Sequence, residues 1–169
     1  MIQMNDRSAE LSESISAAAS VKRSLQVVGG SSKLFYGREP EGAVLAVSDH
    51  TGIIAYDPTE LVVTVRAGTR LSELVEVVSH ERQMLPFDPP IFGSLATIGG
   101  TVACGLSGPS RPYRGAVRDF VLGVGLINGR GEQLRFGGQV IKNVAGYDVS
   151  RLVTGAMGTL GVILDVSIR

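Results

Sequence analysis

Glycine gathers in the second half of this chain, and its distribution limits the folds that the chain can adopt. Of the 22 glycines, 16 lie between Gly93 and Gly161, and they follow no G-x-y period of the kind that builds a collagen helix. A glycine inside a helix costs about 0.5–1 kcal/mol relative to alanine, so a dense set of glycines marks tight turns, or the close approach of another backbone or of a ligand. The distribution therefore predicts two lobes of different character.

One glycine cluster, Thr97-Ile-Gly-Gly-Thr-Val-Ala-Cys-Gly-Leu-Ser-Gly-Pro109, resembles the start of a short helix. Thr97 is suited to cap this helix, and the small residues after it leave room for a neighbour. The first N–H groups of a helix have no partner within it, so a bare helix start is a ready anion site. The cluster is compatible with a site for a large flat or phosphorylated cofactor, or with a tight turn packed against another element.

A second glycine pair follows a predicted strand at residues 24–28, in the run Gly29-Gly30-Ser31-Ser32-Lys33. Glycines let backbone N–H groups approach a ligand, the serines donate, and Lys33 adds a positive charge, so this run can cradle a pyrophosphate. Many ordinary turns have the same composition. Further along, Arg111, Arg114 and Arg118 fit either contacts with a polyanionic ligand or a solvated loop.

The overall composition is that of a globular domain, with 169 residues, 44% of them hydrophobic, and 16 acidic against 16 basic residues. Zero net charge argues against a general nucleic-acid binder, and no apolar run reaches the ~18 residues that a membrane span needs. Cys104 is the only cysteine, which excludes an internal disulfide, and its small neighbours are typical of a packed thiol. His50 and His80 have no H-x-x-x-H spacing, so no metal site is predicted; His80 is expected at the surface and His50 in a structural role.

Periodicity and turn residues predict the following elements. Helices are expected at 6–19, at 70–82, after Thr97 and at 148–156, strands at 24–28, 61–65 and 162–168, a hairpin at 120–127 and 133–136, and an extended linker at 84–90. Alternation of strand and helix indicates an α/β lobe over about 20–90, and a second lobe over about 93–169. The sequence contains no P-loop, no complete G-x-G-x-x-G and no G-x-S-x-G nucleophile motif.

Three separated motifs resemble the vanillyl-alcohol-oxidase/p-cresol-methylhydroxylase flavoprotein superfamily. Val28-Gly-Gly-Ser-Ser-Lys33 is similar to its first pyrophosphate loop, Thr97-Ile-Gly-Gly-Thr-Val-Ala103 to its second, and Gly155-Ala-Met-Gly-Thr-Leu-Gly-Val-Ile163 to its closing motif. Three further stretches, Tyr56-Asp-Pro-Thr-Glu-Leu-Val-Val, Val102-Ala-Cys-Gly-Leu-Ser-Gly-Pro and the run 135–151, resemble the FAD-binding subunits of bacterial glycolate oxidases.

The resemblance implies an α+β protein in which two α/β subdomains hold FAD between them, over residues 1–169 and without a C-terminal cap domain. Carried over by position, Gly29, Gly30, Ser31, Ser32 and Lys33 would hold the pyrophosphate; Thr97, Ile98, Gly99, Gly100, Thr101, Ala103 and Gly105 would line the pyrophosphate and ribityl region; Ser107, Gly108 and Pro109 would continue that wall; and Gly158, Val162 and Ile163 would lie along the cofactor, with Val162 near the flavin pyrimidine. The first loop has no histidine, which implies non-covalent FAD.

The same resemblance implies the FAD domain of a flavin-dependent 2-hydroxy-acid dehydrogenase that oxidises glycolate to glyoxylate. Its partners would be a second flavoprotein subunit and an iron–sulfur subunit, in the cytoplasm or at the membrane through the complex. The alternatives are a related D-lactate-type dehydrogenase and a non-catalytic FAD-binding or assembly subunit. No residue is assigned to substrate binding or proton transfer, so the chain alone is expected to be inactive.

Overall fold

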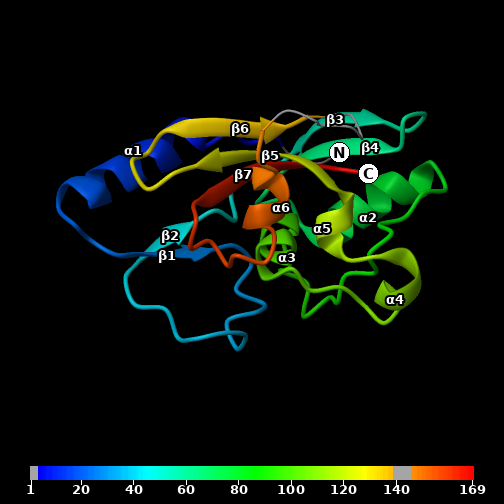
Figure 1. Cartoon of the computed structure of the whole chain (residues 1–169), viewed down its shortest axis with the longest axis horizontal. Coiled ribbons are helices and arrows are strands. Elements are labelled where there is room, and N and C mark those ends of the chain that lie inside the picture. Colours follow the sequence, from blue (N-terminus) through cyan, green and yellow to red (C-terminus); the bar gives the residue numbers. More distant parts are fainter. Residues whose placement is uncertain (1–3, 139–145) are drawn as a thin grey trace.

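Two β-sheets organise the chain in its computed structural model, which describes residues 4–138 and 146–169 (Figure 1). The smaller sheet pairs β1 (Leu25–Val28) in parallel with β2 (Ala43–Ala46). The larger sheet is antiparallel throughout and has the order β3-β4-β7-β5-β6. Its strands are β3 (Ile53–Asp57), β4 (Val62–Arg66), β5 (Val121–Ile127), β6 (Gln133–Gly137) and β7 (Val162–Ile168).

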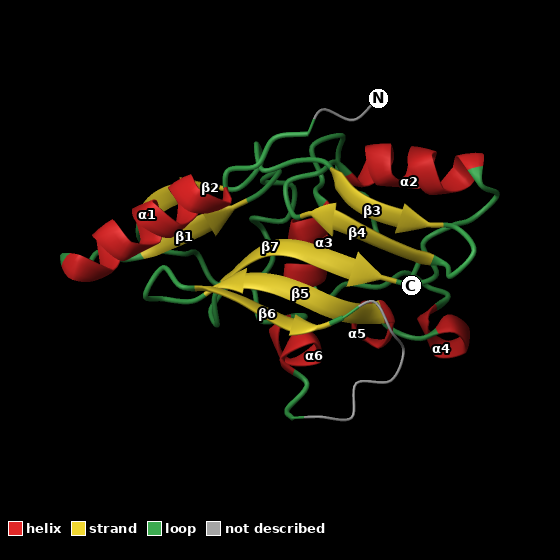
Figure 2. Cartoon of the chain, turned by 90° about the horizontal axis from the view of Figure 1, so that it is seen from above, coloured by secondary structure: helices red, strands yellow, loops and turns green. Residues whose placement is uncertain are grey.

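The helices divide between the two sheets. The α1 helix (Ser8–Ser20) lies beside β1 and β2, whereas α2 (Leu71–His80) runs near β3 and β4 (Figure 2). One face of the large sheet carries α3 (Ile98–Cys104), α5 (Val117–Phe120) and α6 (Val149–Val153), and α4 (Arg111–Arg114) lies further out (Figure 1). The predicted helices after Thr97 and Asp148 are confirmed, and each begins with a cap: Thr97 Oγ1 accepts the N–H of Gly100, and Asp148 Oδ1 that of Arg151.

The core forms where α3 packs on the middle of the large sheet. Ile98 and Val102 of α3 are fully buried, as are Val65, Val124 and Val166 on neighbouring strands. Because β7 pairs with both β4 and β5, these β-branched side chains come from distant parts of the chain and meet on one face. The fully buried strand expected near residues 61–65 is therefore confirmed, and β7 has the bounds predicted for it.

The segment at residues 84–90 is more than the linker that its prolines predict. Phe87 is fully buried, and the centroid of its ring lies 6.3 Å from that of Phe120. The Phe87 carbonyl also accepts the N–H of Gly108 at 3.1 Å. Prolines do prevent regular structure here, yet an irregular segment can still carry a core side chain. This part of the chain thus ties the segment after α3 to the core.

Hydrogen bonding in the large sheet crosses the lobe boundary expected near residue 90. The strands β3 and β4 precede that boundary, and β5, β6 and β7 follow it. Thr64 Oγ1 on β4 lies 2.8 Å from Ser167 Oγ on β7, in a buried side-chain pair. The mixture of helices and sheets agrees with the α+β class, while the subdomain bounds of 20–90 and 93–169 stay a prediction.

The N-terminal segment is fastened to the large sheet by polar contacts. Arg66 of β4 pairs with Asp6 at 2.8 Å, and the Arg7 N–H donates to Nδ1 of His50 at 3.0 Å. His50 is 2% exposed, and burial lowers the pKa of its imidazole. The structural role predicted for His50 agrees with this position. Within the described residues, none of the helices is long and apolar enough to cross a bilayer.

Candidate cofactor site

A cavity of about 530 Å³ separates β1 and the loop after it from α3 and the segment that leads into β7. It therefore lies between the two sheets, bordered by the glycine-rich stretches that the sequence singled out. The predicted site residues that line it are Gly29, Gly30, Ser31, Ser32, Lys33, Thr97, Gly99, Gly100, Ala103, Gly158 and Ile163. The fold thus brings all three motifs together around one space, although they are distant in sequence.

The other predicted site residues do not line this cavity. Ile98 and Thr101 are fully buried, and the Thr101 hydroxyl donates to the Thr97 carbonyl at 2.9 Å. Val162 is buried beside Ile163 on β7, where successive side chains point to opposite faces. Gly105 ends α3 with a φ of 65°, a left-handed conformation that suits glycine, and packs against Gly155.

The residues that follow α3 make their contacts outside the cavity. Ser107 Oγ accepts the Val117 N–H at 3.0 Å, Gly108 packs against Asp88, and Pro109 is exposed. These positions stay predictions as cofactor contacts.

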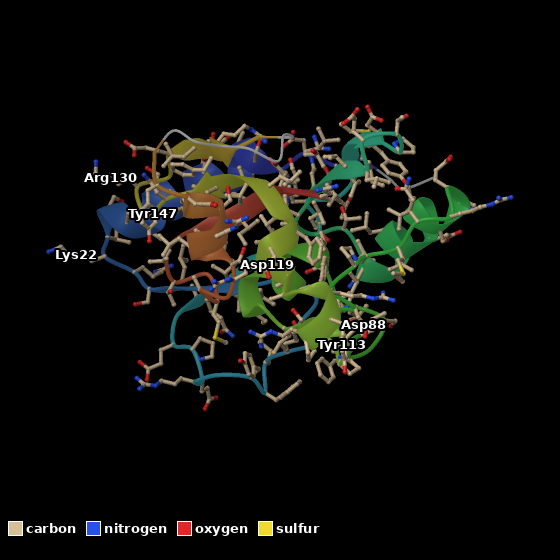
Figure 3. The ribbon with its side chains drawn as sticks, turned by 45° about the vertical axis from the view of Figure 1, so that its right-hand side comes forward. Lys22, Asp88, Tyr113, Asp119, Arg130 and Tyr147 are labelled. Carbon is tan, nitrogen blue, oxygen red and sulfur yellow. The ribbon has the colours of Figure 1, made fainter. Side chains whose placement is uncertain are left out.

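The three arginines considered as anion ligands also lie outside the cavity. Arg111 and Arg114 are on α4, and Arg118 is on α5, all with exposed side chains. Figure 3 shows their neighbour Tyr113 at the surface near Asp88, and Tyr113 is 92% exposed. The solvated alternative therefore agrees better with the structure than contact with a ligand in this cavity.

Sequence reasoning missed the apolar half of the cavity. Its lining includes Leu25, Val27 and Val47 next to the two parallel strands, together with Tyr36 and Met157. The first three follow from the strand pattern once β1 is known to border the cavity. Tyr36 and Met157 lie in loops with no regular period, so no local signal could have placed them here.

Backbone N–H groups in the loop after β1 make no hydrogen bond within the described residues. Across residues 4–138 and 146–169, no acceptor receives the N–H groups of residues 29–34. The loop keeps its shape through close packing instead, because a Cβ on Gly30 would overlap the Leu95 carbonyl, and one on Gly29 would lie 2.7 Å from Thr97 Oγ1. Consecutive N–H groups without acceptors form an anion-binding concavity, so this loop fits a phosphate group.

Lys33 supplies the positive charge of this loop. It is 8% exposed and lines the cavity, and within the described residues its ammonium makes no ion pair and no hydrogen bond. The nitrogen lies 6.0 Å from the centroid of the Phe92 ring. Burial lowers the pKa of Lys33, and the nearby Cys104 partly offsets this effect. A buried charge without an ion pair or hydrogen bond is costly, so Lys33 is suited to bind an anion in this cavity.

The start of α3 differs from the bare helix end expected from the sequence. Its first N–H groups are all used: Ile98 donates to the Thr69 carbonyl at 3.0 Å, Gly99 to the Ala67 carbonyl at 2.9 Å, and Gly100 to Thr97 Oγ1 at 3.2 Å. The expectation of free donors here is wrong, because the turn after β4 supplies two acceptors. This wall can offer a ligand space and van der Waals contact, but few free donors.

The cavity therefore combines a polar end with an apolar end. The polar end has N–H donors and one ammonium, which suits a phosphate, and the apolar end suits a flat organic group. In the part of the chain that the structure describes, no cluster of three His, Cys, Asp or Glu side chains can hold a metal ion. These features match a dinucleotide cofactor with a pyrophosphate at its centre.

Comparison with known proteins identifies the class. Residues 5–137 match the family model described as an FAD binding domain. The chain belongs to this family, and FAD is therefore the cofactor class to which its cavity corresponds. The predicted resemblance to FAD-binding flavoprotein subunits and the predicted cofactor are confirmed at this level.

Individual proteins of known sequence or structure are similar to this chain. The chain is 51% identical over its whole length to glycolate oxidase subunit GlcE of Escherichia coli K12, and spans 48% of that protein. It is 31% identical over 76% of its length to glycolate oxidase subunit GlcD of Bacillus subtilis 168, covering 27% of it. A solved structure of alkyldihydroxyacetonephosphate synthase shares the fold, with a TM-score of 0.77 and 21% identity over 94% of this chain and 29% of that one. The chain thus spans about half or less of the length of these relatives.

Proposed function

We propose that this chain is the FAD-binding domain of a flavin-dependent 2-hydroxy-acid dehydrogenase, and that it serves a glycolate oxidase. The observation that carries the proposal is the set of uncommitted donors around buried Lys33, in a chain 51% identical to GlcE over its full length. Bound FAD supplies the hydride-accepting chemistry, while the protein positions it and tunes its surroundings.

Each wall of the cavity has its own task in this proposal. The N–H groups of residues 29–32 bind the pyrophosphate, and Lys33 balances part of its charge. Gly100 leaves the cavity open, because a Cβ there would contact only Thr97 Oγ1, at 3.1 Å, apart from the backbone of its own helix. The apolar half, with Val27 and Ile163, excludes water from a flat ring. The cofactor is held without a covalent bond, so acid precipitation releases all of it into solution.

The proposal extends to partners and substrate. The proposed partners are a second flavoprotein subunit and an iron–sulfur subunit, which would accept the electrons, and the proposed substrate is glycolate. A D-lactate-type dehydrogenase is the alternative within the same class, and a non-catalytic FAD-binding subunit is the alternative outside it. The high identity to GlcE favours glycolate. No residue of this chain is assigned to the substrate carboxylate or to proton removal.

A titration of FAD into apo protein tests the proposal directly. One saturable site per chain, with quenching of flavin fluorescence and a higher Tm, is expected. Failure of a folded protein to bind FAD overturns the proposal. The holo protein is then mixed with glycolate or D-lactate, alone and with its partner subunits. Bleaching of the flavin by glycolate only in the assembled complex is expected, and bleaching by D-lactate instead supports the related dehydrogenase. A complex that oxidises glycolate with this flavin still unbleached supports the non-catalytic role.

A further inference from the structure

Cys104 has no part in the function proposed above, yet it borders the same cavity. It is the last residue of α3, is partly buried, and is the only cysteine of the chain. It follows Gly100 by four residues, so both lie on the same side of the helix. Both residues line the cavity. Any group attached to the Cys104 sulfur must extend into the space left open there, because the buried side chains of Ile98 and Val102 fill the core on the other side.

Lys33 provides a second and independent sign that a ligand belongs beside this thiol. Lys33 is 8% exposed and lines the same cavity, and apart from its contact with the Phe92 ring its ammonium has no ion pair or hydrogen bond among the residues described. The two groups are near enough to influence each other: burial raises the pKa of the Cys104 thiol, and the nearby Lys33 charge partly offsets this effect. An unpartnered buried cation favours an anion close by. The Cys104 sulfur therefore stands at the edge of the space where that anion must lie.

We propose that Cys104 is a modification site that controls cofactor occupancy: a mixed disulfide on its sulfur excludes FAD, and bound FAD shields the sulfur. This inference rests on the proposed function, because the anion beside Lys33 is taken to be the FAD pyrophosphate. The modifying reagent is a low-molecular-weight disulfide, such as glutathione disulfide. Its carboxylates are attracted to the same ammonium, so the adduct and the pyrophosphate compete for both the space and the charge.

The chemistry is a thiol–disulfide exchange that balances without a further oxidant. The Cys104 thiolate attacks one sulfur of glutathione disulfide, the sulfur–sulfur bond of the reagent breaks, and a new one forms to Cys104. The departing glutathione thiolate takes up the proton that Cys104 lost. A thiol reductant reverses the step. Reaction is fastest in the apo protein, where the cavity is open, and it slows as FAD fills the site.

Intact-mass spectrometry of the full chain tests the proposal, because one cysteine allows one adduct. FAD binding to unmodified protein is measured first, so that a failure of the proposed function is seen separately. Saturating FAD is then expected to slow adduct formation with glutathione disulfide at least tenfold. The adduct, still folded by circular dichroism, is expected to bind FAD at least tenfold more weakly, and reductant restores the affinity.

Three variants complete the test. Cys104→Ser forms no adduct, and glutathione disulfide leaves its FAD affinity unchanged. Ser79→Cys in that background puts a thiol on the exposed surface of α2, and FAD must not alter its rate of modification. Lys33→Met slows modification of Cys104 at neutral pH, because it removes the charge that favours the thiolate. Equal modification rates with and without bound FAD, an adduct with normal affinity, or no adduct at all overturns the inference.

Discussion

The two glycine-rich walls of the cavity look alike in sequence and differ in physical character. The loop after β1 keeps the N–H groups of residues 29–34 without acceptors in the described chain, and buries Lys33 without an ion pair or hydrogen bond there. The start of α3, in contrast, has its N–H groups bonded to Thr97, Thr69 and Ala67. Only the first wall is prepared for an anion, whereas the second is complete by itself. Glycine therefore allows close packing in both walls, but only the first wall leaves its backbone donors without acceptors.

This difference matters because the first wall buries the charge of Lys33 without an ion pair or hydrogen bond among the described residues, which is unfavourable without a ligand. An uncommitted donor or an unpaired charge costs stability when buried. The cost is recovered when a cofactor binds, so FAD binding and the stability of the apo protein should respond in opposite directions when the Lys33 charge is removed. In the second wall, changes should either disturb the packing or narrow the cavity, depending on which way each glycine faces.

The largest effect is expected at Gly30. Gly30→Ala forces a Cβ into the Leu95 carbonyl, so the loop must leave its position. We expect FAD binding to be lost and the free energy of unfolding to fall by about 3 kcal/mol, the upper part of the usual range for overpacking. Calorimetry and thermal unfolding measure both. Gly129→Ala is the matched control, because nothing lies within 4 Å of a Cβ at Gly129; a Gly30→Ala protein as stable as this control would contradict the packing of the first wall.

Adjacent glycines of α3 separate packing from cofactor access. Both line the cavity, but a Cβ on Gly99 would lie 2.8 Å from the Ala67 carbonyl oxygen, whereas one on Gly100 would approach only Thr97 Oγ1, at 3.1 Å. Gly99→Val is therefore expected to lower stability by about 1–3 kcal/mol. Gly100→Val should keep its Tm, since valine is no poorer than glycine as a helix former, but should weaken FAD binding roughly ten- to hundredfold. The same effect of both variants on the Tm would show that the walls were assigned wrongly.

Removing the Lys33 charge should have a smaller effect, which weakens FAD binding but stabilises the apo protein. Lys33→Met is expected to weaken FAD binding by about 1–2 kcal/mol, as for one charge-assisted hydrogen bond. It should also raise the Tm of the apo protein, because an unpaired buried charge disappears. Lys22→Met is the control: Figure 3 shows Lys22 extending away from the ribbon, and its side chain is exposed. An unchanged FAD affinity would remove Lys33 from the site.

The smallest effect concerns pH. Burial lowers the pKa of Lys33 from its ordinary value of about 10.4. Between the lowered pKa and the ordinary one, the unfolded chain binds more protons than the folded chain, so the stability of apo protein rises as pH rises through this window. FAD affinity should fall over the same window, because neutral Lys33 no longer attracts the pyrophosphate. Urea unfolding and FAD titration from pH 7 to 10 measure both trends, and Lys33→Met should show neither; equal trends in that variant would assign them to another group.

Local signals in the sequence were sufficient for much of the fold. The Thr97 and Asp148 caps, the apolar stripe of α2 and the run of β7 are each encoded within a few residues, and all appear as predicted. The three motifs also predicted that one cavity would collect them. The bounds of individual elements differ by one or a few residues, as at α1, which was expected at 6–19 and begins at Ser8.

What could not be predicted depends on contacts between distant residues. The acceptors at Ala67 and Thr69 that complete α3 lie between β4 and α2, far earlier in the chain, and no residue near Gly99 indicates them. The burial of Phe87 within a proline-rich segment has the same origin. Some residues that the family resemblance predicted as cofactor contacts, such as Ser107, bond to other residues of the chain in the structure. As cofactor contacts they stay predictions. Residues 139–145, which belong to the run 135–151 singled out in the sequence, lie outside the described residues.

The position of β7 at the centre of the large sheet has a consequence for synthesis. Among the strands of this sheet β7 comes last in sequence, yet it pairs with both β4 and β5, and Val63 of β4 lies opposite Ile168. On the ribosome, therefore, the earlier strands must wait without their central neighbour, and contacts this distant in sequence form slowly. Gly158 and Ile163, which border the cavity, emerge with the same late segment. The walls of the cavity are therefore complete only after this region has been translated.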